Sequence, residues 1–258
     1  MRLRAVLLAT SLVVGTAMGS AFAAPITNFV TNGDFSNVSG GINSPTQFGT
    51  NATVTPQQFI TGWTGNNGYE IWYPSANAAV NVNATGQYTY TDHEKLWQVT
   101  APPTGPGTFV GLDGDQTNGI QASIQQVLHD LTVGSTYQVS FSWAGAQMQS
   151  RTGATTEYLA VSLGSQTQNT AVLNNKSEGF TGWQTATLDF VASSTSETLK
   201  FLSVGTPSGL PPMALLTHVS ATDVPEPGSL ALLGSGLVGL GLVLRRRRKA
   251  AKAPKTEV

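Results

Sequence analysis

The sequence predicts an all-β chain: a jelly-roll or galactose-binding-like β-sandwich of about nine to eleven strands, with an N-terminal signal helix and a C-terminal single membrane helix. Three observations predict the sandwich. The central part of the 258-residue chain is rich in Thr, Ser, Asn, Gln and Gly, which disfavours long helices. Several short stretches alternate apolar and polar residues with period two, and turn signals separate these stretches. A closed barrel is the main alternative.

The clearest predicted strands lie in the second half of the chain. In the stretch 137–143, Tyr137, Val139, Phe141 and Trp143 face one way and polar residues face the other. The same pattern predicts strands over residues 157–163, 184–190, 198–204 and 213–220. In the first half we expect strands over residues 69–73, 96–99, 109–112 and 122–128, and a long irregular loop over the polar, glycine-rich residues 37–59.

The first 23 residues have the features of a signal peptide. Arg2 and Arg4 precede an apolar stretch, and a small-x-small site follows it, which predicts cleavage between Ala23 and Ala24. The apolar stretch is too short to favour a membrane-spanning helix. The sequence therefore predicts export of a single domain over residues 24–223.

The charge and cysteine content exclude several classes of function. Residues 24–228 hold thirteen acidic and four basic residues, a net charge near −9. Such a domain repels phosphate backbones, so we expect no nucleic-acid partner. The absence of cysteine excludes disulfides and thiolate metal sites.

The end of the chain combines a proline-rich motif, an apolar run and a basic cluster. Residues 229–244 carry no charge, and as a helix they would span ~24 Å, less than the roughly 30 Å hydrocarbon core of a bilayer. The basic cluster that follows predicts a cytoplasmic tail over residues 250–258 by the positive-inside rule. The motif is Val224, Pro225, Glu226 and Pro227, and the cluster is Arg245, Arg246, Arg247, Arg248 and Lys249.

Residues 224–249 resemble the PEP-CTERM sorting signal of Gram-negative bacteria, because all three parts stand in the order that defines that class. The resemblance implies an exosortase as the processing partner and the inner membrane as a transient anchor. It also implies a final location at the cell surface or in an exopolysaccharide matrix such as a biofilm. A plain C-terminal membrane anchor is the alternative.

Short motifs through the exported segment resemble the galactose-binding-like β-sandwich of many carbohydrate-binding modules and surface proteins. They include residues 28–35, Gly62-Trp63, 109–114, 139–143 and Gly182-Trp183. In related modules a calcium ion can join the first and last strands, and Asp34 is the candidate ligand here. The chain departs from that pattern at Thr217, which stands where an aspartate would be expected.

Candidate sugar-binding residues follow from the chemistry of carbohydrate modules, which present flat aromatic faces beside hydrogen-bonding groups. Trp72 and Glu70 alternate with Tyr73 in a predicted strand, so we expect one face of that strand to be exposed; Trp97 is a second candidate. Packing in the core is the competing interpretation, since most aromatic residues of strand-rich domains are buried.

No catalytic constellation stands out. The three histidines are far apart in sequence, and no Gly-x-Ser-x-Gly motif is present. We therefore expect a non-enzymatic surface or matrix protein that interacts with extracellular polysaccharide and needs no cofactor beyond a structural calcium. A dedicated carbohydrate-binding module with a specific sugar ligand and a glycoside hydrolase are the alternatives.

Overall fold

The structure is a computed structural model that describes residues 27–48, 59–66, 68–88, 94–115, 121–224, 236, 238–242 and 244–245. Several predictions lie outside the described residues: the signal peptide 1–23, the cleavage between Ala23 and Ala24, Pro225, Glu226, Pro227, Arg246, Arg247, Arg248, Lys249 and the tail 250–258. The described residues between 236 and 245 are helical, within the segment for which a helix was expected. Among the described residues, no helix has both the length and the hydropathy needed to cross a membrane.

The described part of the chain contains twelve strands and one short helix before residue 224. They are β1 (Thr46–Phe48), β2 (Thr64–Gly65), β3 (Glu70–Tyr73), α1 (Ala76–Ala79), β4 (Phe109–Asp113), β5 (Ser123–Leu128), β6 (Thr136–Gln147), β7 (Thr155–Leu163), β8 (Gln166–Asn169), β9 (Leu173–Asn175), β10 (Gln184–Val191), β11 (Glu197–Thr206) and β12 (Pro212–Asp223).

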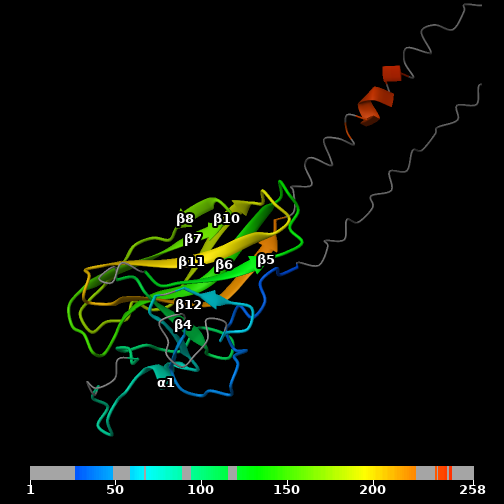
Figure 1. The fold of residues 1–258 in the computed structure, drawn as a ribbon. Coiled ribbons are helices and arrows are strands. Elements are labelled where there is room, and N and C mark those ends of the chain that lie inside the picture. Colours follow the sequence, from blue (N-terminus) through cyan, green and yellow to red (C-terminus); the bar gives the residue numbers. More distant parts are fainter. Residues whose placement is uncertain are drawn as a thin grey trace, which may run out of the picture.

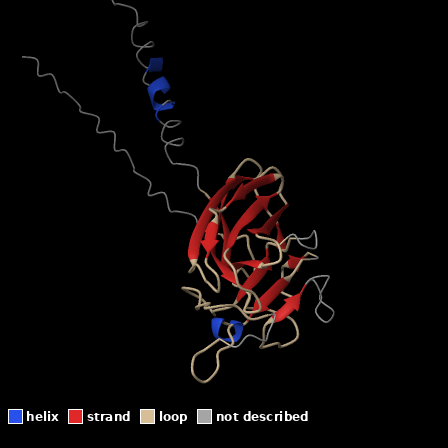
Figure 2. Ribbon diagram, turned by 90° about the vertical axis from the view of Figure 1, so that its left-hand side faces the viewer, coloured by secondary structure: helices blue, strands red, loops and turns tan. Residues whose placement is uncertain are grey.

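These strands form two antiparallel sheets packed face to face (Figure 1, Figure 2). The first sheet has the order β1-β3-β4-β12-β6-β10, and the second has the order β2-β5-β11-β7-β8, with β9 also paired to β7. The predicted β-sandwich is confirmed. β8 and β10 are edge strands of different sheets, and the Gln166 and Gln168 amides donate to the backbone of β10 at Val191 and Asp189. These hydrogen bonds occupy backbone groups that an edge strand would otherwise expose.

The main hydrophobic core lies between the two sheets, as the alternation predicted. Inward residues of β6 meet inward residues of β11, with Phe141 and Phe201 packed edge to face. Trp63 packs at a tilt against Phe201 and edge to face against Phe35. Aromatic pairs of this kind add to the stabilisation that burial of apolar area provides.

A second core lies on the outer face of the first sheet. The described residues of the segment 74–108 (74–88 and 94–108), which include α1, cover that face and bury Ile71, Tyr73, Phe109 and Leu215. α1 lies beside β4 and β12 on the side away from the second sheet (Figure 1). The predicted strand over residues 96–99 is wrong: Leu96 makes one isolated bridge to Met148 and belongs to this cover.

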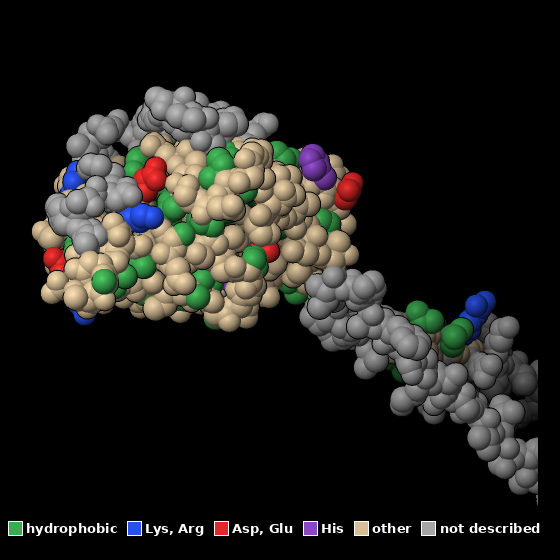
Figure 3. All heavy atoms as spheres, turned by 90° about the horizontal axis from the view of Figure 1, so that it is seen from below, with side chains coloured by type: hydrophobic (Ala, Val, Ile, Leu, Met, Phe, Trp, Pro, Cys, Tyr) green, Lys and Arg blue, Asp and Glu red, His purple; other side chains and the backbone are tan. Residues whose placement is uncertain are grey.

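Because of the covering layer, the outer faces of the two sheets differ in solvent exposure. The first sheet is buried on both faces over much of its area, whereas the outward side chains of β5, β11, β7 and β8 are almost all partly or fully exposed. Seen from below, the surface is mostly uncharged, with few acidic or basic side chains (Figure 3). The uncovered outer face of the second sheet is therefore where a binding surface is best sought.

Candidate functional site

The three aromatic or acidic candidates on β3 are buried. Trp72 is 3% exposed and its Nε1 donates to the Phe35 carbonyl at 2.8 Å, while Glu70 and Tyr73 are 0% exposed. The expectation that one face of this strand is exposed was wrong. Trp72 and Glu70 face the sandwich core, and Tyr73 faces the cover of residues 74–108. A sugar ring would reach none of them without opening a core.

Trp97 also lies in a packed position. It is 7% exposed, its Nε1 donates to the Arg151 carbonyl at 2.9 Å, and Tyr88 packs on its ring edge to face. Trp97 therefore connects the cover to the loop that follows β6. Its ring is packed against other residues and is not open to a sugar.

The residues near Asp34 do not fit a calcium ion. The Asp34 carboxylate accepts from the Ser36 backbone N–H and hydroxyl, at 3.2 and 2.9 Å, as in an ordinary turn. The Thr217 hydroxyl donates to the Thr108 carbonyl at 2.8 Å, and the Thr108 hydroxyl donates to the Asp34 carbonyl. The backbone carbonyls of Thr108 and Asp34 thus already accept hydrogen bonds from hydroxyl groups. Among the described residues, no group of three or more His, Asp or Glu is placed to hold a metal.

Three buried carboxyls have raised pKa values: Glu70, which the sequence singled out as a candidate sugar ligand, and Glu157 and Asp113, which it did not. Burial raises the pKa of Glu70 to about 8, that of Glu157 to about 8 and that of Asp113 to about 7. Burial is the largest cause in each case, and only Asp113 has charged neighbours, Asp115 and Arg151.

The two deepest carboxyls are too far apart to act as a glycosidase pair. Glu157 lies against Gly145 of β6, and β6 is three places from β3 in the first sheet. At ~4.8 Å per strand, Glu70 and Glu157 are separated by roughly 14 Å. A pair of catalytic carboxyls needs about 5 to 9.5 Å. Glu70 and Glu157 therefore do not form such a pair.

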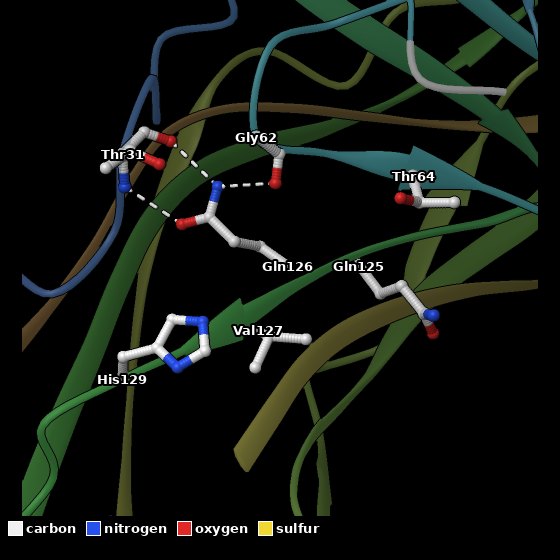
Figure 4. Close-up of a pocket in the computed structure, with 7 residues that line it drawn as sticks. All are labelled: Thr31, Gly62, Thr64, Gln125, Gln126, Val127 and His129. Carbon is white, nitrogen blue, oxygen red and sulfur yellow. Dashed lines mark hydrogen bonds between the residues drawn. The ribbon is translucent and has the colours of Figure 1, made fainter. Parts of the chain in front are cut away.

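A groove of about 360 Å³ runs beside β5 at the edge of the second sheet (Figure 4). The buried Gln126 amide builds its inner side: Nε2 donates to the carbonyls of Thr31 and Gly62 at 3.0 and 2.9 Å, and Oε1 accepts from the Thr31 N–H at 2.9 Å. These three hydrogen bonds join the opening segment and the turn before β2 to β5. The remaining groove residues, Thr64, Gln125, Val127 and His129, are drawn with them in Figure 4.

The groove continues onto the outer face of the second sheet. Because paired residues of antiparallel strands share a face, the register places one row of outward side chains across five strands. The row is Thr64, Gln125, Lys200, Ser162 and Thr167. At ~4.8 Å between strands it spans roughly 19 Å. Every member offers a hydrogen-bonding group.

The same face carries an apolar strip with one aromatic ring. Tyr158 pairs with Val204, and Ala160 pairs with Leu202, and all four side chains are partly exposed. Tyr158 is therefore the aromatic residue of this face. The signal for it was present, since the alternation over residues 157–163 that directs Leu159 inward directs Tyr158 outward. This signal did not identify Tyr158 as a candidate, because no sequence pattern shows which of the two sheets has an outer face exposed to solvent.

Two family models match parts of the chain. Residues 223–248 match the PEP-CTERM protein-sorting motif, which confirms the sorting signal. Residues 110–210, which run from β4 to the loop after β11, match the model described as "Protein of unknown function (DUF642)". No curated protein matches the sequence.

Solved structures match this chain only with low sequence identity and low TM-scores. The enzymatically active domain of tailspike protein 4 from bacteriophage CBA120 is 16% identical, with a TM-score of 0.34; the match covers 76% of this chain and 21% of that one. A structure described as "CBM4 structure and function" is 13% identical, with a TM-score of 0.34, over 75% of this chain and 99% of that one. The CBM22-1 xylan-binding domain of Paenibacillus barcinonensis Xyn10C is 12% identical, with a TM-score of 0.35. That match covers 64% of this chain and 88% of the xylan-binding domain. At this similarity, what the chain binds has to be argued from its own surface.

Proposed function

Because the chain carries a PEP-CTERM sorting motif, which indicates an exported protein sorted to the cell surface, we propose that its sandwich is a non-enzymatic module that binds extracellular polysaccharide there. The binding surface is the outer face of the second sheet together with the groove beside β5. An exosortase processes the tail, and the domain is held in the inner membrane only until then.

The observation that carries this proposal is the chemistry of the uncovered face. A pyranose ring has apolar C–H faces and a rim of hydroxyl groups, so a site for it needs apolar area beside hydrogen-bonding side chains. The strip of Tyr158, Ala160, Leu202 and Val204 supplies the first. The polar row from Thr64 to Thr167 supplies the second.

The shape of the face suits a chain of sugars better than a single sugar. It is a sheet surface that continues into a groove, and the polar row crosses all five strands of the sheet order. A rigid sheet also holds its side chains in place before binding, which limits the entropy lost when the ligand docks. We therefore expect this face to bind a polysaccharide through many weak contacts with successive sugars.

The test is binding of the exported domain, residues 24–224, to a panel of immobilised polysaccharides. We expect Tyr158→Ala and Gln125→Ala to weaken binding about tenfold each, since each removes one of the two kinds of contact. Gln184→Ala is the matched control, because Gln184 is exposed on β10 at the far edge of the first sheet. Unchanged binding by both face variants, with the fold intact, would remove this face as the site.

A further inference from the structure

We infer that the polysaccharide bound by this face carries carboxylates, as hexuronic acid residues do, and that Lys200 pairs with them. This inference rests on the proposed function and names the class of its ligand. It comes from one charged side chain at the centre of an otherwise uncharged row.

Lys200 lies in the middle of the polar row. It is on β11, the central strand of the second sheet, directly between Gln125 on β5 and Ser162 on β7. The side chain is partly exposed and points outward, since Leu199 and Phe201 on either side of it are buried in the core. Its ammonium group therefore projects from the part of the face that a bound chain would cross.

Lys200 has no partner in the part of the chain that the structure describes: it makes neither a hydrogen bond nor an ion pair there. Two other basic residues of the domain are engaged. Lys95 Nζ donates to the Ala78 carbonyl at 2.6 Å, and Arg151 Nη1 donates to the Ser150 carbonyl at 3.0 Å, with the charge of Asp113 close by. The fourth, Lys176, is exposed in the turn after β9, outside this face.

Lys200 is one of four basic residues in a domain with a net charge near −9, where acidic groups outnumber basic ones by more than three to one. The overall charge opposes sulfated polymers, which carry more charge per sugar than a polyuronate, because their additional negative groups would meet the acidic surface. Lys200 is the charged side chain of the row, so it can pair with one carboxylate of a polymer that lies across the face. The neighbouring amide and hydroxyl groups of Gln125, Ser162 and Thr64 are left to bind sugar hydroxyls.

The experiment compares three polymers: polygalacturonate, the same polymer with its carboxylates fully methyl-esterified, and neutral xylan. The expected result is that wild type binds polygalacturonate most tightly and loses affinity as salt is raised, because exposed charge pairs are screened. Lys200→Met should weaken binding to polygalacturonate about fivefold and leave binding to the methyl ester unchanged. Lys200→Arg should retain most of the affinity.

Lys176→Met is the matched control, since it removes the same charge elsewhere on the domain. Equal binding of wild type to polygalacturonate and its methyl ester, or an equal loss in both lysine variants, would overturn the uronate inference while leaving glycan binding in place. Tighter binding to dextran sulfate than to polygalacturonate would also overturn it. If Tyr158→Ala binds every polymer as well as wild type does, the proposed function itself fails.

Discussion

Glu70 shows how a single residue can have a chemistry that its sequence position does not suggest. In the strand Glu70–Tyr73 it was a candidate for hydrogen bonding to a sugar, but it is fully buried, with Oε1 accepting from the Asn66 N–H at 3.2 Å. Its Oε2 has no partner among the described residues. Burial disfavours the charged form and raises its pKa to about 8, so Glu70 is mostly protonated at neutral pH.

This shift makes the stability of the domain depend on pH. In the unfolded chain Glu70 titrates near its ordinary pKa of 4.5, whereas in the folded domain it keeps its proton up to about pH 8. The unfolded state therefore binds fewer protons between these values, and the free energy of unfolding falls as pH rises from about 4.5 to about 8. The contribution is fully present below pH 4.5 and is lost as pH passes 8.

We expect Glu70→Gln to flatten this dependence. Glutamine has nearly the same shape and no titration, so the slope of unfolding free energy against pH should become shallower by roughly 1 kcal/mol per pH unit. Urea unfolding at several pH values between 5 and 8 measures it. Glu178→Gln, at an exposed glutamate, is the control and should leave the slope as in wild type. Parallel curves for wild type and Glu70→Gln would contradict the assignment.

At the scale of elements, hydrogen bonds from threonine hydroxyl groups connect β12, the last strand, to the opening segment of the domain. Thr217 of β12 donates to the Thr108 carbonyl just before β4, and Thr108 donates to the Asp34 carbonyl in the opening segment. The Val219 N–H donates to the Gly33 carbonyl at 2.8 Å beside them. Thr217 in place of an aspartate was visible in the sequence, but this chain of hydroxyl contacts was not, since residues 34, 108 and 217 meet only in three dimensions.

Thr217→Val tests this junction. Valine keeps the shape but removes the donor, which leaves a buried carbonyl with one partner fewer, and we expect the free energy of unfolding to fall by about 1–2 kcal/mol. The same change at Thr222 on the same strand, where no side-chain hydrogen bond is involved, should cost less. Thermal unfolding of wild type in chelator and in excess calcium should coincide; a calcium-dependent rise in Tm would contradict the hydroxyl junction.

The layering of elements explains where the sequence prediction of the site was wrong. Alternation over residues 69–73 correctly predicted a strand and its two faces. It could not show that residues 74–88 and 94–108 fold back over the outer face, because that cover pairs with the sheet through scattered contacts such as Leu96 with Met148. The same alternation over residues 157–163 did indicate which way Tyr158 points.

At the scale of the whole molecule, the described sandwich reaches the first residue of the sorting motif, Val224. The Val224 N–H donates to the Thr136 carbonyl at 2.9 Å, and Asn28 and Thr222 form a bridge that places the first and last described segments of the domain side by side. The contacts that the structure describes for the sandwich are therefore made by residues up to Val224. Removal of the tail costs the domain none of its described contacts.

Mass spectrometry of the protein from its native host tests this separation. We expect the mature species to lack the residues beyond the Pro-Glu-Pro motif, and we expect residues 24–224 to unfold at the same temperature as a form that keeps the tail. Replacing Pro225, Glu226 and Pro227 by alanine is the matched control and should leave the tail attached. A mature protein that still carries Arg245 and the basic residues after it would show a permanent anchor.

The sequence by itself determined the class of fold, the main strands and the sorting signal, because these depend on local patterns: period-two alternation, turn residues, and a motif whose parts lie in consecutive residues. The tertiary structure alone decided which faces are open. Burial of Glu70 and Trp72, the hydroxyl junction at Thr217 and the row through Lys200 each depend on residues brought together from distant parts of the chain. Strand periodicity states that a side chain lies on one of two faces, and only the packing of the remaining layers determines which face meets solvent.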